Sequence, residues 1–271
     1  MKKTLLLIFI ITFSIFGSAQ SRTVTDWNSL GLKHFNEKNF QAAVKSFSQA
    51  IEMDPKYWPA YNNRGVALTK LQKADLAVND FNYCITEDPG NVNAYYNRAQ
   101  AKIILEDFKG ALADYQYVLV LEPDNKYLYI QMGLCHEQKK SYKNALASFD
   151  AAISMDKYFL DAYIKRGELK MRKGKYEEAI RDFSRATKLD SNCIQAYYQK
   201  GVAKLTIGNY SGARKEFSTI IEKDPTHKDA YYKRGVATYD GGSKSKACAD
   251  FEKALELNHK LAQATISKYC Q

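Results

Sequence analysis

The stretch WPAYNNRGVALTKLQKADLAVNDFNYCITEDPGN, residues 58–91, decides the fold, because close relatives of it fill most of the chain. Its motif YNNRG at 61–65 returns as YYNRA at 95–99, YIKRG at 163–167, YYQKG at 197–201 and YYKRG at 231–235. A recurring aromatic residue, base and small residue could be a binding motif that is used many times. It could equally be a packing motif, and the rest of the stretch distinguishes the two.

Four columns of residues recur every 34 positions over seven copies, without insertion or deletion. The first is aromatic, from Trp27 to Tyr231, and the second, four residues on, is glycine or alanine. The third is always alanine, and the fourth, from Phe47 to Phe251, is always aromatic. A strict period of this length predicts a protein built from stacked structural repeats.

Within one copy the pattern is helical. In residues 74–87, the side chains of Ala77, Phe81 and Cys84 fall on one helix face, and Pro89 follows where the helix must end. Each copy is therefore expected to form two antiparallel helices, with the glycine of the first opposite the alanine of the second so that the backbones approach closely. One hairpin cannot bury its apolar face alone, so the copies are expected to stack.

The 34-residue period, with Tyr61, Gly65, Ala77, Phe81 and Pro89 in these relative places, resembles the tetratricopeptide repeat. The resemblance implies an all-α fold, a right-handed superhelical solenoid. We expect helix-turn-helix repeats at 24–57, 58–91, 92–125, 126–159, 160–193, 194–227 and 228–260, and a capping helix at 261–271. The fold serves many unrelated functions, so the resemblance implies no particular partner.

The chain departs from the family pattern at a few positions. An aromatic residue is common in the family at the places of Leu68, Lys102, Lys170, Lys204 and Thr238. Lys157, Ser191 and His259 replace the proline. These changes are expected to loosen single joints between repeats and to leave the fold intact.

A base in the opening motif is matched by an acid sixteen residues later. Five copies carry both charges, two carry neither, and none carries one alone. Paired change indicates contact, and arginine suits a two-pronged contact with a carboxylate. The predicted ion pairs are Arg64–Asp80, Arg98–Asp114, Arg166–Asp182, Lys200–Glu216 and Arg234–Asp250. The alternative is a ladder of bases that binds anions.

The resemblance also implies a binding surface, because the first helices of such repeats line a concave groove. The predicted groove residues are Asn28, Leu32, Asn62, Asn63, Val66, Tyr96, Asn97, Gln100, Ile130, Leu134, Ile164, Glu168, Tyr198, Val202, Tyr232 and Val236. A partly apolar strip is typical of an interaction site, although the same side chains could simply pack against the next helix. The groove columns hold no lysine or arginine, which argues against the carboxylate clamp of the family.

The first 19 residues are expected to be a signal peptide. A positive start precedes an apolar run at 5–16, and small residues at 17–19 suit cleavage after Ala19. The run is short for a membrane span, and an uncleaved anchor is the alternative. We expect an exported protein, in a bacterial periplasm or at the cell envelope, that does not span the membrane after cleavage.

The five cysteines are an odd number for an oxidising compartment. Cys84 and Cys135 occupy core columns, and Cys193 lies at a turn between repeats. Cys248 should face the seam that the capping helix covers, and Cys270 lies on that helix. A disulfide between Cys248 and Cys270 is one expectation, and two free thiols are the other.

The sequence offers no chemistry of catalysis. The four histidines lack the spacing of metal ligands, and neither a CxxC pair nor a glycine-rich phosphate loop occurs. We expect a non-enzymatic scaffold that binds a protein or peptide, with no cofactor and no small-molecule substrate. One alternative is an accessory subunit of an envelope enzyme or secretion assembly that uses the convex face or the edges. The net charge of +10 allows a nucleic-acid binder, but export argues against one.

Overall fold

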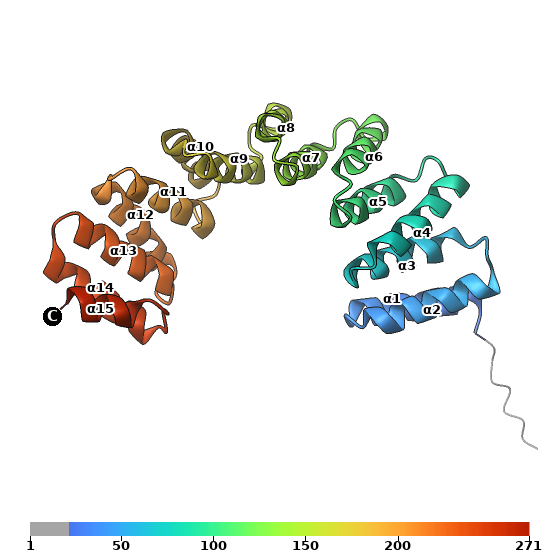
Figure 1. The fold of residues 1–271 in the computed structure, drawn as a ribbon, viewed down its shortest axis with the longest axis horizontal. Helices are drawn as coiled ribbons and strands as arrows, with labels where there is room; N and C mark the ends of the chain where they lie inside the picture. Colours follow the sequence, from blue (N-terminus) through green and yellow to red (C-terminus); the bar gives the residue numbers. More distant parts are fainter. Residues whose placement is uncertain (1–21, 271) are drawn as a thin grey trace, which may run out of the picture. The chain divides into compact units, whose positions relative to one another are not determined.

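The computed structural model describes residues 22–270, which form fifteen α-helices and no strand (Figure 1). The helices are α1 Val24–Asn36, α2 Phe40–Met53, α3 Trp58–Lys70, α4 Ala74–Glu87, α5 Val92–Ile104, α6 Phe108–Leu121, α7 Lys126–Gln138, α8 Tyr142–Met155, α9 Leu160–Arg172, α10 Tyr176–Leu189, α11 Ile194–Thr206, α12 Tyr210–Lys223, α13 Lys228–Asp240, α14 Lys244–Glu256 and α15 Ala262–Tyr269. The predicted all-α repeat fold is confirmed. The predicted signal peptide lies outside the described residues.

The chain divides into two compact units, after Asn97 within α5. In the first unit α2 packs against both α1 and α3, and α3 packs against α4. In the second unit each helix from α6 to α15 packs against its neighbour in sequence. Three pairs of first helices also touch, α7 with α9, α9 with α11 and α11 with α13. Helices of adjacent pairs thus bury the apolar faces that one pair would leave open. No helix of the described residues has the length and apolar character needed to cross a bilayer.

The glycines of the second column make room for a phenylalanine ring and not, as expected from the sequence, for an alanine. A Cβ atom on Gly65 would lie 2.7 Å from the ring of Phe81, and one on Gly133 would lie 2.4 Å from Phe149. A real Cβ atom cannot approach so closely. The fully buried ring therefore occupies the space that the missing side chain leaves, and the alanine column is buried beside it.

The turn inside each helix pair is made in one way throughout. One residue adopts a positive φ, and the N–H of the next residue donates to the carbonyl oxygen five positions earlier, as from Asn39 to His34 at 2.9 Å. This Schellman motif ends the first helix and satisfies its last carbonyl groups. The positive-φ residues, 34 positions apart, are Lys38, Gln72, Glu106, Lys140, Gly174, Gly208 and Gly242.

The turns between pairs depend on an aspartate column that the sequence analysis did not single out. The Asp54, Asp88, Asp156, Asp190 and Asp224 carboxylates accept a hydrogen bond from the backbone N–H two residues on, at 2.8–3.1 Å. Such a bond stabilises a turn without help from proline. The joints at Lys157 and Ser191, which lack the proline, keep this bond, so the expected loosening has no visible cause there.

Candidate partner-binding surface

In the first unit, asparagines of the predicted groove join neighbouring first helices. The Asn63 side-chain amide donates to Asn28 Oδ1 at 2.9 Å, and that of Asn97 donates to Asn62 Oδ1 at 3.3 Å. An asparagine amide has two donor hydrogens and an oxygen that accepts twice, so each pair uses only part of this capacity. Asn28 is buried, at 9% exposure, so only the half-buried Asn62, Asn63 and Asn97 have remaining donors and acceptors that can serve an extended backbone.

A small apolar notch of about 60 Å³ lies beside this ladder. Its lining includes three predicted groove residues, Leu32, Asn63 and Val66, together with Phe35 and Phe47. The Leu32 side chain is the exposed member, at 41%. The first unit therefore offers an apolar contact next to amide groups, on a small scale.

In the second unit the structure corrects two predicted groove residues. Ile130 and Ile164 are 6% and 5% exposed and belong to hydrophobic clusters, so a partner cannot reach them. For these two residues the packing alternative is the right one. Leu134 and Val202 are partly buried against the same kind of cluster. The predicted strip is therefore interrupted in its middle by core side chains.

The aromatic residues at the end of the strip are held in place by other rings. Tyr198 contacts the Phe217 and His227 rings, each with centroids 5.9 Å away, and burial raises the pKa of its hydroxyl. The Tyr232 ring stacks on His259 with centroids 4.1 Å apart, and its hydroxyl lies 3.1 Å from Thr265 Oγ1. Such fixed rings lose little conformational freedom when a partner binds.

An opening lined by a predicted groove residue lies between α9 and α11. It has a volume of about 530 Å³ and is lined by Glu168, Met171, Arg172, Tyr176, Gln199 and Thr206. The Glu168 carboxylate accepts from Lys165 Nζ at 3.0 Å and from Gln195 Nε2 at 2.8 Å. Arg172 pairs with Glu137 at 2.5 Å. The charged groups of this cleft, called the α9–α11 cleft below, are therefore fixed before any partner arrives.

A second opening, of about 200 Å³, lies where α15 covers α13 and α14. Tyr232 and Val236 of the predicted strip line it with Tyr239, Thr265 and Tyr269. The Cys248 and Cys270 sulfur atoms are 2.07 Å apart and bonded, which attaches the end of α15 to α14. The capping helix thus forms one wall of this opening.

The structure brings together the residues of all five predicted ion pairs. The contact distances are 2.7 Å for Arg64–Asp80, 2.6 Å for Arg98–Asp114, 2.5 Å for Arg166–Asp182, 3.1 Å for Lys200–Glu216 and 2.7 Å for Arg234–Asp250. The four arginines also donate from Nε to the same carboxylate. The hydrogen bonds to Asp80 raise the pKa of Arg64.

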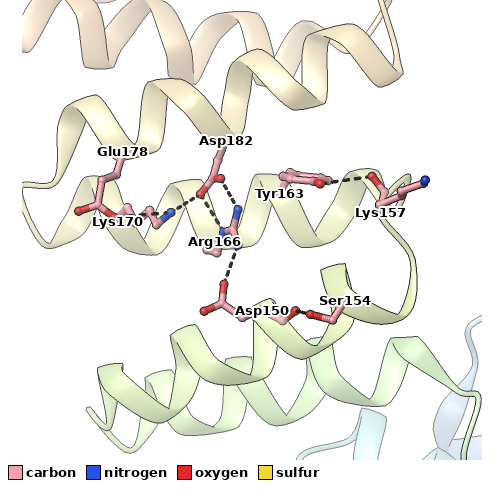
Figure 2. A network of polar contacts seen from close by, with 8 residues as sticks. All are labelled: Asp150, Ser154, Lys157, Tyr163, Arg166, Lys170, Glu178 and Asp182. Carbon is pink, nitrogen blue, oxygen red and sulfur yellow. Dashed lines mark hydrogen bonds and ion pairs between the residues drawn. The ribbon is translucent and has the colours of Figure 1, made fainter.

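Two further partners of these pairs escaped the sequence analysis (Figure 2). A lysine four residues after the base reaches the same acid: Lys170 Nζ lies 2.8 Å from Asp182. Lys102 and Lys204 do the same at Asp114 and Glu216. The constant spacing of twelve residues from lysine to acid was a usable signal.

The other missed partner belongs to the preceding helix pair. Arg166 Nη1 donates to Asp150 at 2.6 Å, and the equivalent atoms of Arg64 and Arg234 donate to the hydroxyl groups of Ser48 and Ser218 at 3.1 Å (Figure 2). Each of these arginines therefore ties three helices together. Within the described residues no three histidine, cysteine, aspartate or glutamate side chains are arranged to hold a metal ion.

Comparison with known proteins gives one consistent answer. Sequence models described as tetratricopeptide repeat match residues 27–57, 46–79, 96–158 and 198–261, and one described as TPR repeat matches 167–208. The STIP1 homologue of Dictyostelium discoideum is 38% identical over 56 residues, 21% of this chain. The match spans only 10% of that protein's length.

Solved structures agree with the sequence models. YrrB, described as a TPR protein with an unusual peptide-binding site, is 26% identical, with a TM-score of 0.56 over 69% of this chain and 97% of its own. The C-terminal part of a TPR repeat-containing protein from Cytophaga hutchinsonii reaches 0.71 at 18% identity, over 86% and 97%. Yeast Tom70 reaches 0.59 at 18% identity, over 89% and 51%. The chain belongs to the tetratricopeptide repeat family.

Proposed function

We propose that this protein is a non-enzymatic scaffold of the cell envelope that binds a peptide or protein segment along the first helices of its repeats. Tetratricopeptide repeat proteins bind protein or peptide partners, and this chain belongs to that family. The observation that carries the finer proposal is the α9–α11 cleft, which is open, partly apolar and furnished with fixed hydrogen-bonding groups.

The cleft suits an extended peptide because it combines two kinds of contact. Met171 and Tyr176 supply apolar area, and Gln199 supplies neutral donors and an acceptor for backbone groups. The Thr206 hydroxyl donates to the Val202 carbonyl oxygen at 3.0 Å and adds a further acceptor. Glu168 is held by Lys165 and Gln195, so little ordering is needed on binding. The description of YrrB as having a peptide-binding site supports a peptide as the class of ligand.

The envelope location rests on residues 1–19, which have the charge and hydropathy of a signal peptide. If the protein is exported, the mature chain begins at Gln20. Sequencing the N-terminus of protein purified from its own cells tests this point. Retention of Met1 would contradict export by cleavage.

The binding face is tested with a photo-crosslinking amino acid placed at Gln199, inside the cleft. A matched variant carries it at Arg181, an exposed residue of the second helix α10. We expect a partner to be crosslinked from Gln199 and not from Arg181, and the additional change Glu168→Ala to reduce the yield. Crosslinking from Arg181 alone would contradict the proposal and favour an accessory subunit that uses the second helices.

A further inference from the structure

A cleft of about 580 Å³ on the α12–α14 side has no role in the proposed function. It is lined by Ser211, Arg214, Lys215, Ser218, Arg234, Thr238, Ser243, Lys246 and Asp250. Four of these side chains are cations, four carry hydroxyl groups, and one is a carboxylate. The carboxylate of Asp250 is already held by Arg234 at 2.7 Å. The other cations line the opening without such a partner.

Arg214, Lys215 and Lys246 form no ion pair with any carboxylate in residues 22–270. Arg214 instead lies over the end of α13, with Nη1 3.4 Å from the Ala237 carbonyl oxygen. Clustered cations repel one another unless an anion lies between them. The cleft therefore carries an excess of positive charge that no carboxylate of these residues balances.

A related set of charges lies 68 residues earlier (Figure 2). Leu146 and Ala147 stand there at the places of Arg214 and Lys215, and Lys170 stands at the place of Thr238. There Asp150 takes the place of Ser218 and binds Arg166 Nη1 at 2.6 Å. Glu178 takes the place of Lys246 and lies 3.7 Å from Lys170. Two carboxylates of the chain thus fill positions that hold a serine and a lysine in the α12–α14 cleft.

The first turn of α14 also lacks negative charge. Asp and Glu residues are favourable in the first turn of a helix, because they offset the partial positive charge there. The first turn of α10 carries Glu177 and Glu178, whereas that of α14 carries no acidic residue and has Lys244 and Lys246. An anion beside Lys246 would therefore be stabilised by the helix end as well as by the side chains.

We propose that the α12–α14 cleft binds an acidic segment of a partner protein, with one carboxylate in the position that Asp150 fills in the earlier repeat and another beside Lys246. Arg234 and Ser218 take one carboxylate, and Lys246 with Lys215 takes another. The site lies on α12, α13 and α14 and shares no residue with the α9–α11 cleft. The inference therefore does not depend on the proposed function.

The test is fluorescence anisotropy with a labelled hexaglutamate peptide and a hexaglutamine control. We expect hexaglutamate alone to bind, with affinity that falls as the salt concentration rises. The double substitution S218D/K246E supplies the first carboxylate from the chain itself and reverses the charge that binds the second, so it should weaken binding about tenfold or more. S29D/K33E, at exposed positions of α1, changes the net charge equally and should leave affinity within about twofold.

A second variant, Lys215→Gln, guards against a folding defect in the double substitution and should also weaken binding. Thermal melts of all variants must match the parent. Hexaglutamate binding that S218D/K246E and Lys215→Gln leave unchanged would overturn the proposal, as would no binding at all. If an equal concentration of inorganic phosphate displaced hexaglutamate, the cleft would be a site for a single oxyanion. The proposal that it binds an acidic segment would then be overturned.

Discussion

The carboxylates of the ion pairs differ in the number of cations that hold them. Asp182 is bound by Arg166 and also by Lys170, whereas Asp80 is bound by Arg64 and has Leu68 where the lysine would stand. The Asp80 and Asp182 side chains are nearly equally buried, at 7% and 5% exposure. Removing the arginine therefore leaves very different surroundings in the two copies.

Arg64→Ala should destabilise the protein by about 3 kcal/mol, because it leaves a buried carboxylate with no cation. Arg166→Ala should cost about half as much, since Lys170 still neutralises Asp182. Chemical denaturation of both variants measures the difference. Equal losses would contradict the idea that the lysine is a second partner of the acid.

At the residue scale, the sequence predicted the contacts between residues that keep one constant spacing along the chain. The acid sixteen residues after each base could be found because both charges disappear together in two copies. The lysines at Lys102, Lys170 and Lys204 were instead read as departures from a family pattern. The burial of Ile130 and Ile164 could not be predicted, because a column fixes the direction of a side chain and not how closely the next helix covers it.

At the scale of single elements, the turn inside each helix pair repeats one backbone conformation with two kinds of residue. Gly174, Gly208 and Gly242 adopt the positive φ without cost, whereas Lys38, Gln72, Glu106 and Lys140 adopt it with a Cβ atom. Residues other than glycine are disfavoured in this region by about 1 kcal/mol.

Gly174→Ala should therefore lower the free energy of unfolding by about 1 kcal/mol, because the left-handed conformation is strained for a residue with a Cβ atom. The new Cβ atom would meet no neighbouring atom, so this backbone strain is the whole effect. Lys140→Gly should raise it by a few tenths of a kcal/mol or leave it unchanged, since the relief of strain is offset by unfolded-chain entropy. Thermal unfolding compares the two. A stabilising Gly174→Ala would mean that the turn is not held in the left-handed conformation.

The cysteines should differ in reactivity according to their elements. Burial raises the pKa of the Cys84 thiol to about 12 and that of Cys135 to about 11, so almost no thiolate is present at neutral pH. Cys193 is partly exposed, and Cys248 is bonded to Cys270.

Iodoacetamide should therefore label only Cys193 in the folded, oxidised protein, and Cys248 and Cys270 in addition after mild reduction. Mass spectrometry of peptides identifies the labelled sites. Rapid labelling of Cys84 in the folded protein would contradict its placement in the core. Labelling of Cys270 before reduction would contradict the disulfide.

At the scale of the molecule, the repeat architecture was predictable because seven copies share one register over most of the chain. Each helix pair could be located from its alanine and aromatic columns, and the structure places fourteen helices at these positions with a fifteenth after them. The binding surface was less predictable. The family pattern indicates which columns of residues face a partner. The position and shape of the openings also depend on side chains outside these columns, such as Met171, Arg172 and Tyr176.

The central claim is that the first helices of the repeats bind the partner. The most direct measurement is hydrogen exchange of the full chain with and without the partner crosslinked from Gln199. We predict slower exchange in α9 and α11, around Glu168 and Thr206, with α10 and α12 unchanged. Protection confined to α10 and α12 would contradict the account.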